Sequence, residues 1–418
     1  MNNTKLSNSF KNVWVWTLLA CAVGAGILYL PINAGLHGIW PFIILIVITF
    51  PIVYLAHLNL TRFVLIASTG TTNINDIVYE NFSKKFYNTF SICYFLAIYP
   101  MILIYTVGLT NTVDSFLITN FALVIPRAIL AFLLLACILS IVISQPDFIR
   151  KVIKYLALPL ASILFLLSVY LIPKWQFQQF EVWPNTSDLF NTLFITLPVI
   201  IFTVNYSPII STFALYHSTH SQSPEQDTTN ILWRSSLLIF GFSMFFVFSC
   251  IMAVDPNNMT IAKAANANIL VYMSTLFDDP ILRIVNPLIA MTAMTGACFS
   301  SFFGAKESVI GLIEQSLHVH KVSSKKLDYL ATAIILIPCY IFAVLNTSIL
   351  AIMSALSGPI IALLLFIFPI YAIYHIPKLE KHHITPWDRF NNFYVLTIGL
   401  ISFSAILYSF KYLIFYLM

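Results

Sequence analysis

The sequence predicts an all-α polytopic membrane protein, and three observations lead to this fold class. Of the 418 residues, 59% are hydrophobic and 9% are charged, whereas a soluble globular domain carries about 25% charged residues. The apolar residues gather in runs of roughly 20 residues, the length that a helix needs to cross the hydrocarbon of a bilayer. Two of these runs are interrupted by glycine, proline and polar residues. A water-soluble fold cannot hide this much apolar surface, so soluble classes are excluded.

Eleven apolar runs are long enough to be transmembrane helices. We expect a single transmembrane domain over residues 1–418, in which residues 1–12 form an N-terminal tail. The first run begins at Val13 and is too long for a cleaved signal, so it is expected to direct insertion itself. Residues 254–280 contain IAKAANANILVYMSTLF and are expected to include a short helix on the membrane surface. The predicted spans are residues 13–36, 41–66, 87–112, 123–143, 152–172, 189–215, 231–253, 281–315, 328–345, 348–374 and 391–416.

The lysines and arginines predict the orientation in the membrane. If the N-terminus is cytoplasmic, five of the 21 fall on the opposite side and the other sixteen face the cytoplasm. This bias is what the positive-inside rule requires, and eleven spans then place the C-terminus outside. The cations are scattered over separate loops rather than gathered on one face, so nucleic-acid binding is not expected. The five outer cations are Arg127, Lys174, Lys263, Arg283 and Lys411.

The residue pattern disfavours other classes of membrane protein. The six cysteines lie inside apolar runs without short spacings, so we expect core residues rather than a metal site or disulfides. The spans hold no His-Glu-x-x-His motif and no paired catalytic residues, so an enzyme is not expected. A channel is a rival interpretation, but the sequence shows no repeated pore helix. We predict no cofactor and no obligate protein partner.

The first span contains VGAGILYLPINAG, which is unusually poor in helix-forming residues. Glycine costs about 1 kcal/mol and proline about 3 kcal/mol in a helix interior, and Gly24, Gly26, Pro31 and Gly35 all fall here. In lipid, unpaired backbone groups are tolerated where they line a cavity or face a ligand. We therefore predict a helix that is broken near Gly24–Gly26. The alternative is a kinked, continuous helix whose small residues pack on a neighbouring helix.

The sixth span contains a second such stretch, TLPVIIFTVNYSPIIS at residues 196–211. Pro198 and Pro208 enclose a polar group of residues, and Pro208 disfavours helical geometry at the residue before it. The alternative is a simple proline kink with polar side chains toward neighbouring helices. Interrupted helices five spans apart are typical of inverted-repeat transporters. We therefore predict repeats over about 13–172 and 189–374, with an extra helix over about 391–416.

The chemistry of broken helices predicts the ligand class. A half-helix that begins near Ile27 offers free N–H groups and the positive end of its dipole to a carboxylate. The half-helix that ends near Gly24 offers free carbonyl groups to an ammonium, so a zwitterionic amino acid satisfies both. A side chain at Gly26 would occupy the space of the carboxylate. The expected substrate-binding residues are Gly24, Ala25, Gly26, Ile27, Thr203, Asn205, Tyr206 and Ser207.

The segment GAGILYLPINAG resembles the first-helix motif of the hydroxy and aromatic amino acid permeases, in particular their serine/threonine branch. The resemblance covers most of the chain in the order of that family, which belongs to the amino acid–polyamine–organocation superfamily. Further segments that carry it are YFLAIYPMILIYTVGLTNTVDSF (94–116), SQPDFIRKV (144–152), TLPVIIFTVNYSPIISTFA (196–214), FFGAKES (302–308) and SGPIIALLLFIFPIYAI (357–373).

The resemblance implies eleven helices in the leucine-transporter-like fold, and proton-coupled uptake with alternating access across the bacterial inner membrane. The aromatic branch usually lacks the PINAG ending, which favours L-serine or L-threonine over tryptophan or tyrosine as the substrate. Helix three lines the cavity in this fold, so Tyr99 is expected to close over the substrate or to hydrogen-bond its carboxylate, although generic packing of one tyrosine among 20 is the alternative. The serine/threonine members often carry a lysine in helix eight, whereas TGACFSSFFGAKE has no basic residue before Lys306.

Three residues of the eighth span are expected to serve ion coupling. Glu307 is the acidic residue that lies within a long apolar run, and intramembrane ionisable groups are functional candidates. Ser300 and Ser301 precede it on the helix that faces the first break in similar folds. The alternatives are a solvated Lys306–Glu307 pair at a helix end and serines that only pack. A proton is the expected driving ion and sodium is the alternative.

Overall fold

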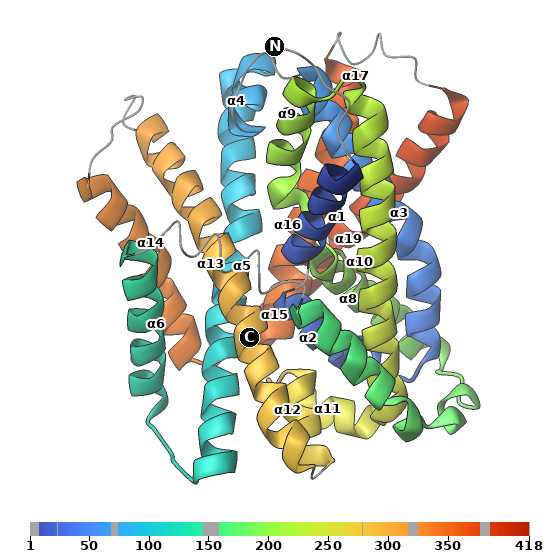
Figure 1. The fold of residues 1–418 in the computed structure, drawn as a ribbon, viewed down its shortest axis with the longest axis vertical. Helices are drawn as coiled ribbons and strands as arrows, with labels where there is room; N and C mark the ends of the chain where they lie inside the picture. The colour runs from blue at the N-terminus through green and yellow to red at the C-terminus, as the bar shows by residue number, and fades with distance from the viewer. Residues whose placement is uncertain are drawn as a thin grey trace.

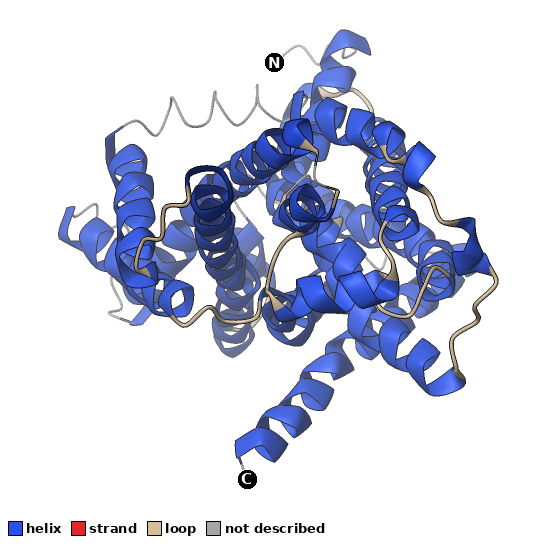
Figure 2. Cartoon of the chain, turned by 90° about the horizontal axis from the view of Figure 1, so that it is seen from below, coloured by secondary structure: helices blue, strands red, loops and turns tan. Residues whose placement is uncertain are grey.

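The computed structural model of the protein describes residues 8–22, 24–67, 74–144, 159–277, 279–316, 325–376 and 385–417. Within these residues, all regular secondary structure is helical (Figure 2). The helices are α1 (Asn8–Ala22), α2 (Ala25–Ala34), α3 (Trp40–Ala67), α4 (Ile74–Asn81), α5 (Lys84–Phe121), α6 (Arg127–Ser144), Pro159–Tyr170, α8 (Thr186–Thr203), α9 (Ile210–His220), α10 (Pro224–Ala253), α11 (Pro256–Ala264), α12 (Ile269–Leu276), α13 (Pro280–Ser316), α14 (Lys325–Val344), α15 (Ile349–Ile352), α16 (Gly358–Ala362), α17 (Phe368–His375) and α19 (Pro386–Leu417).

Short turns of other helix types connect several of these elements. The 3-10 turns η1 (Ile172–Lys174) and η2 (Phe177–Phe180) lie before α8, and η3 (Ser207–Ile209) lies between α8 and α9. The π-helical turns η4 (Met353–Ser357) and η5 (Leu363–Ile367) join α15, α16 and α17 into one continuous rod.

Seven segments in the described part of the chain are long and apolar enough to cross a membrane. They correspond to predicted spans two, three and six to ten, which supports the all-helical membrane class. The described segments are Trp40–Ala67, Lys84–Phe121, Thr186–His220, Pro224–Ala253, Pro280–Ile313, Lys326–Val344 and Ile349–His375. The total of eleven spans and the inverted repeat stay predictions.

The connecting segments collect at two opposite ends of the helical bundle (Figure 1). The helices α4 and α17 lie at one end, and α11 and α12 lie at the other. The segment 254–280, expected to hold a short surface helix, forms these two short helices. Each begins at a side-chain cap, because Asp255 accepts from the backbone N–H of Asn258 and Asn268 accepts from that of Val271.

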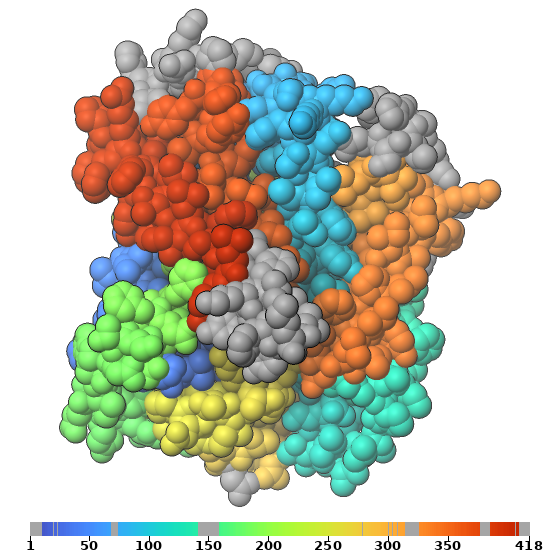
Figure 3. Space-filling view, turned by 180° about the vertical axis from the view of Figure 1, so that it is seen from behind, coloured from blue at the N-terminus to red at the C-terminus, as the bar shows by residue number. Residues whose placement is uncertain are grey.

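Close helix contacts in the interior depend on glycine where two backbones meet. A β-carbon at Gly358 of α16 would lie 2.3 Å from the carbonyl oxygen of Pro198 in α8, so a side chain there is sterically excluded. The helix α19 packs against α16 and η5 and lies on the outer surface in red in Figure 3. A β-carbon at Gly399 would lie 2.8 Å from Cβ of Phe366. These contacts fix α8, α16 and α19 relative to one another.

Candidate functional site

The first predicted span is two helices with an interruption between Ala22 and Ala25, which we name the first break. Gly24 caps α2 with an extended backbone, at φ −144° and ψ −160°, and no side chain caps the helix. The first N–H groups of α2 therefore lack helical partners and carry the positive end of its dipole. The prediction of a broken helix is confirmed, although α2 begins at Ala25 rather than near Ile27.

Two neighbouring helices enclose the glycine of the first break. A β-carbon at Gly24 would lie 3.3 Å from the Tyr105 hydroxyl of α5 and 3.3 Å from Cβ of Ala297 in α13. Gly26 faces a different neighbour, the end of α8, because its β-carbon would fall 2.7 Å from Cα and 2.9 Å from Oγ1 of Thr203. The space at Gly26 is thus filled by α8. The expectation that it stays open for a carboxylate is wrong, since two helix backbones meet there.

The sixth predicted span is also interrupted, at residues 204–209, which we name the second break. The helix α8 ends at Thr203, η3 follows, and α9 begins at Ile210. Asn205 bridges the interruption, because its Oδ1 accepts from the backbone N–H of Ser207 at 3.0 Å. Thr203 instead donates to the Val199 carbonyl of its own helix at 2.7 Å. The polar side chains of this motif therefore have different partners.

Tyr206 is fully buried and contacts a histidine that the sequence reasoning missed. Its ring stacks on the His57 imidazole of α3, with centroids 3.5 Å apart and planes inclined by 10°. Its hydroxyl lies 2.6 Å from the Ser236 hydroxyl of α10. Tyr206 thus ties the second break to α3 and α10, and its ring does not line the cavity described next.

The two breaks lie side by side in the bundle. Gly26 contacts Thr203 at the end of α8. The Cys21 thiol near the end of α1 lies at the backbone of Ile209 in η3. Helix ends from both interrupted segments therefore converge, and their unpaired backbone groups share one region of the interior.

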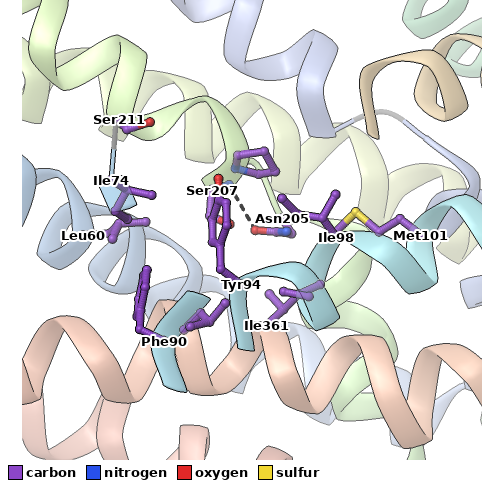
Figure 4. A pocket seen from close by; sticks show the side chains of 13 residues that line it. Leu60, Ile74, Phe90, Tyr94, Ile98, Met101, Asn205, Ser207, Ser211 and Ile361 are labelled. Carbon is purple, nitrogen blue, oxygen red and sulfur yellow. Dashed lines mark hydrogen bonds between the residues drawn. The ribbon is translucent and has the colours of Figure 1, made fainter. Parts of the chain in front are cut away.

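A small cavity of about 30 Å³ lies at the second break (Figure 4). This volume holds only a few water molecules, so the surrounding side chains must move before an amino acid can enter. Asn205, Ser207 and Ser211 supply polar atoms from the interrupted segment. The remaining lining residues come from α3, α4, α5, η3, α16 and η5: Leu60, Ile74, Phe90, Tyr94, Ala97, Ile98, Met101, Pro208, Ile361 and Leu364.

The family model described as transmembrane amino acid transporter protein matches residues 9–414. The chain belongs to this family. The serine transporter SdaC of Escherichia coli (strain K12) is 36% identical to this transporter over 407 residues, which are 95% of this chain and 94% of that protein. The threonine/serine transporter TdcC of Yersinia enterocolitica is 30% identical over 432 residues, with 97% of each chain covered. The family and these relatives are transporters, not enzymes.

Solved structures support the fold of the transporter. A crystal structure of the Eremococcus coleocola manganese transporter, in complex with an aromatic bis-isothiourea substituted compound, aligns with a TM-score of 0.65 at 13% identity. The alignment covers 98% of this chain and 90% of that chain. This likeness concerns the fold alone. In the described part of the transporter, no three His, Cys, Asp or Glu side chains are grouped as a metal site.

The structure places Tyr99 away from both breaks. Its hydroxyl donates to the Ile335 carbonyl of α14 at 3.3 Å, and its ring stacks on Phe95. The face of α5 that meets the breaks carries Met101, which lines the cavity, and Tyr105, which meets Gly24. Residues four apart share a helix face, so Met101 and Tyr105 lie together, whereas Tyr99 lies on a different face of α5.

The residues expected to serve ion coupling lie on α13. Ser301 Oγ lies 3.9 Å from Sδ of Met101, a residue that lines the cavity. The side chains of Ser300 and Glu307 lie outside the described part of the structure. Lys306 pairs with Asp328 at the start of α14, with 3.1 Å between Nζ and Oδ1. The expectations for Ser300 and Glu307 therefore stay predictions.

Proposed function

We propose that this transporter imports L-serine and L-threonine across the bacterial inner membrane by proton symport with alternating access. The observation that carries the proposal is the convergence of two helix breaks in a member of an amino acid transporter family, beside a small, mainly apolar cavity to which Asn205, Ser207 and Ser211 supply polar atoms. The names of the relatives SdaC and TdcC support serine and threonine as the substrates.

The paired breaks match the two charges of an amino acid. The N–H groups that begin α2, at Ala25, Gly26 and Ile27, lack helical partners and suit a carboxylate oxygen. The last carbonyl groups of α1, which ends at Ala22, lack helical partners and suit the ammonium. Asn205 and Ser207 are then available to the substrate hydroxyl. Rearrangement of the cavity for a tryptophan or tyrosine ring would have to be much larger than for serine, which supports a small substrate.

We further propose eleven spans in a leucine-transporter-like 5+5 arrangement, with a cytoplasmic N-terminus and a periplasmic C-terminus. The sorting of connecting segments to two ends of the bundle supports this arrangement (Figure 1). Glu307, Ser300 and Ser301 of α13 are proposed to assist coupling, on the strength of the family resemblance. The driving ion is proposed to be a proton, with sodium as the ion to exclude by experiment.

The proposal is tested by transport in proteoliposomes that contain the purified protein. We expect counterflow of labelled serine and threonine without any gradient, and accumulation when the lumen is made alkaline. Tryptophan and tyrosine should not compete. Transport without counterflow would indicate a channel, and accumulation that needs sodium and ignores pH would exclude proton symport.

A further inference from the structure

Two histidines within the described helices are fully buried and hold the same local hydrogen bond. Nδ1 of His57 in α3 lies 2.7 Å from the Val53 carbonyl, and Nδ1 of His217 in α9 lies 2.8 Å from the Phe213 carbonyl. A carbonyl oxygen accepts and cannot donate, so Nδ1 of each ring carries the proton. Each Nε2 is therefore unprotonated and acts as an acceptor that can bind a proton.

The two Nε2 atoms have different surroundings. Nε2 of His57 accepts from the backbone N–H of Tyr206 at 3.3 Å, inside the second break. The Asn205 side chain also lies within hydrogen-bonding reach of this ring. Nε2 of His217 has no hydrogen-bond partner in the described part of the structure. His57 is therefore the buried histidine whose Nε2 is hydrogen-bonded to a backbone group of the second break.

We propose that His57 is the residue that binds the co-transported proton, and that it transmits protonation to the substrate cavity through Tyr206 and Asn205. The inference rests on the proposed serine import and assigns its coupling step to a residue of α3. His57 lies more than two turns from either end of α3, a helix long enough to span the membrane. An ionisable side chain at this depth is costly and is a candidate for function.

The hydrogen bonds at the second break show how protonation acts. When Nε2 takes up a proton from water, it becomes a donor and can no longer accept from the Tyr206 N–H. An acceptor within reach is Oδ1 of Asn205, which accepts from the backbone N–H of Ser207 while the ring is neutral. If Asn205 turns to the imidazolium, the Ser207 N–H becomes free at the cavity, where Ser207 is a lining residue. That N–H then binds the second oxygen of the substrate carboxylate.

The charge balance makes the two binding events depend on each other. A buried imidazolium without a counter-ion is unfavourable, and so is a buried carboxylate without a donor. Bound together in adjacent places, each stabilises the other, and linkage requires that the proton and the substrate raise each other's affinity equally. When both leave on the opposite side of the membrane, Nε2 is again neutral and accepts from Tyr206.

The groups around the His57 ring that can titrate or carry a charge come from α3 itself and from the helices packed against it. Tyr206 is the titratable group that stacks on His57, and Tyr54 lies one turn before His57 on α3. Arg62, five residues after His57, pairs with Glu225 and Asp388. The helices packed against α3 carry further titratable groups, which include Asp76 and Glu80 of α4, Asp188 of α8, His217 and His220 of α9, Asp227 and Arg234 of α10, His375 of α17 and Arg389 of α19.

The test compares His57→Gln with the matched control His217→Gln in proteoliposomes. The amide of glutamine reaches the position of Nε2 and can accept from Tyr206 N–H, but it does not bind a proton. We expect His57→Gln to keep the rate of serine counterflow within threefold of wild type. Under an inside-alkaline gradient it should accumulate at least tenfold less serine than wild type. His217→Gln should keep both activities.

Different outcomes separate this inference from the proposed function. Wild-type accumulation by His57→Gln would overturn the role of His57 and leave proton symport intact. A wild-type protein that ignores the pH gradient would overturn proton symport itself. If His57→Gln does not fold, ¹⁵N-histidine spectra of wild type and His217→Gln decide the matter. We expect a buried ring with Nδ1–H that becomes imidazolium when serine is added, and its absence would overturn the inference.

Discussion

The two breaks have the same position in their spans but are built from different parts. The first break depends on glycine, and every residue of α2 that follows it is buried. The second break depends on prolines and polar side chains, and Asn205 and Ser207 line a cavity. The first break therefore supplies fixed backbone groups, whereas the second supplies side chains whose hydrogen bonds can be exchanged.

Because of this difference, we expect the two breaks to have different roles during transport. Close packing holds the first break, because Gly24 is enclosed by Tyr105 and Ala297, and Gly26 by Thr203. Packed interiors resist small shifts, so α2 is a rigid partner for the carboxylate. Hydrogen bonds hold the second break, and such bonds exchange at little cost when another donor is present. We expect substrate and proton to change the second break more than the first.

The largest effect on folding and serine binding is expected where a side chain is added at the first break. Gly26→Val would place a branched side chain against the Thr203 backbone, where a β-carbon alone would lie 2.7 Å away. Overpacking of this kind costs about 3 kcal/mol or more when backbone must move, so we expect loss of monodisperse, serine-binding protein. Gly241→Val in α10 is the control, because no atom lies within 4 Å of its β-carbon. A folded Gly26→Val with wild-type affinity would contradict this packing account.

Substitutions at the second break should leave the protein folded but weaken its binding of serine. Asn205→Ala removes the acceptor for Ser207 N–H and a polar group at the cavity. In the proposed cycle Asn205 accepts from the His57 imidazolium when serine is bound. A lost hydrogen bond to a charged group costs roughly 1.5–3 kcal/mol, so we expect the Kd for serine to rise at least tenfold in a folded protein. Thr203→Val is the control, since its hydroxyl bonds to its own helix. Equal effects of the two substitutions, measured by calorimetry, would count against the role of Asn205.

Local composition made the two breaks predictable from the sequence, whereas the contacts between distant segments could not be predicted from it. Glycine and proline weaken a helix wherever it packs, so both interruptions are visible in the sequence. The neighbour of Gly26 belongs to another helix, and the sequence does not reveal it. The contact of His57 with the second break could not be predicted for the same reason, because its partner Tyr206 is 149 residues away. Tyr99 and Tyr105 differ in their position around α5, and only the packing of that helix shows which one meets the first break.

A smaller effect is expected at Tyr105, whose hydroxyl meets the first break. Tyr105→Phe removes a polar group beside Gly24 and should weaken serine binding severalfold, about 0.5–1.5 kcal/mol for a neutral hydrogen bond. Tyr99→Phe removes a hydroxyl that bonds to α14 and should leave the Kd unchanged. Titration of purified variants checks both. A larger loss of serine affinity in Tyr99→Phe than in Tyr105→Phe would indicate that Tyr99 belongs to the binding site.

The smallest effect concerns Lys263 of α11, whose Nζ lies 3.4 Å from Oδ1 of Asn33 in the PINAG motif. Burial lowers the pKa of Lys263, so the folded state binds this proton less tightly than the unfolded state. The stability cost is therefore full below the lowered pKa and disappears as pH rises toward the ordinary value near 10.4. Lys263→Met should raise the unfolding temperature slightly at pH 7, with a smaller difference at pH 10. A difference that grows with pH would contradict this assignment.

The central claim is that two adjacent breaks bind a zwitterionic amino acid, with the carboxylate at the start of α2. The most direct measurement compares the binding of serine and serine methyl ester to purified, monodisperse protein. The ester keeps the ammonium and the hydroxyl but lacks the negative charge that the helix N-terminus attracts. The account predicts that the ester binds at least tenfold more weakly, about 1.4 kcal/mol. Equal affinity for serine and its ester would contradict it.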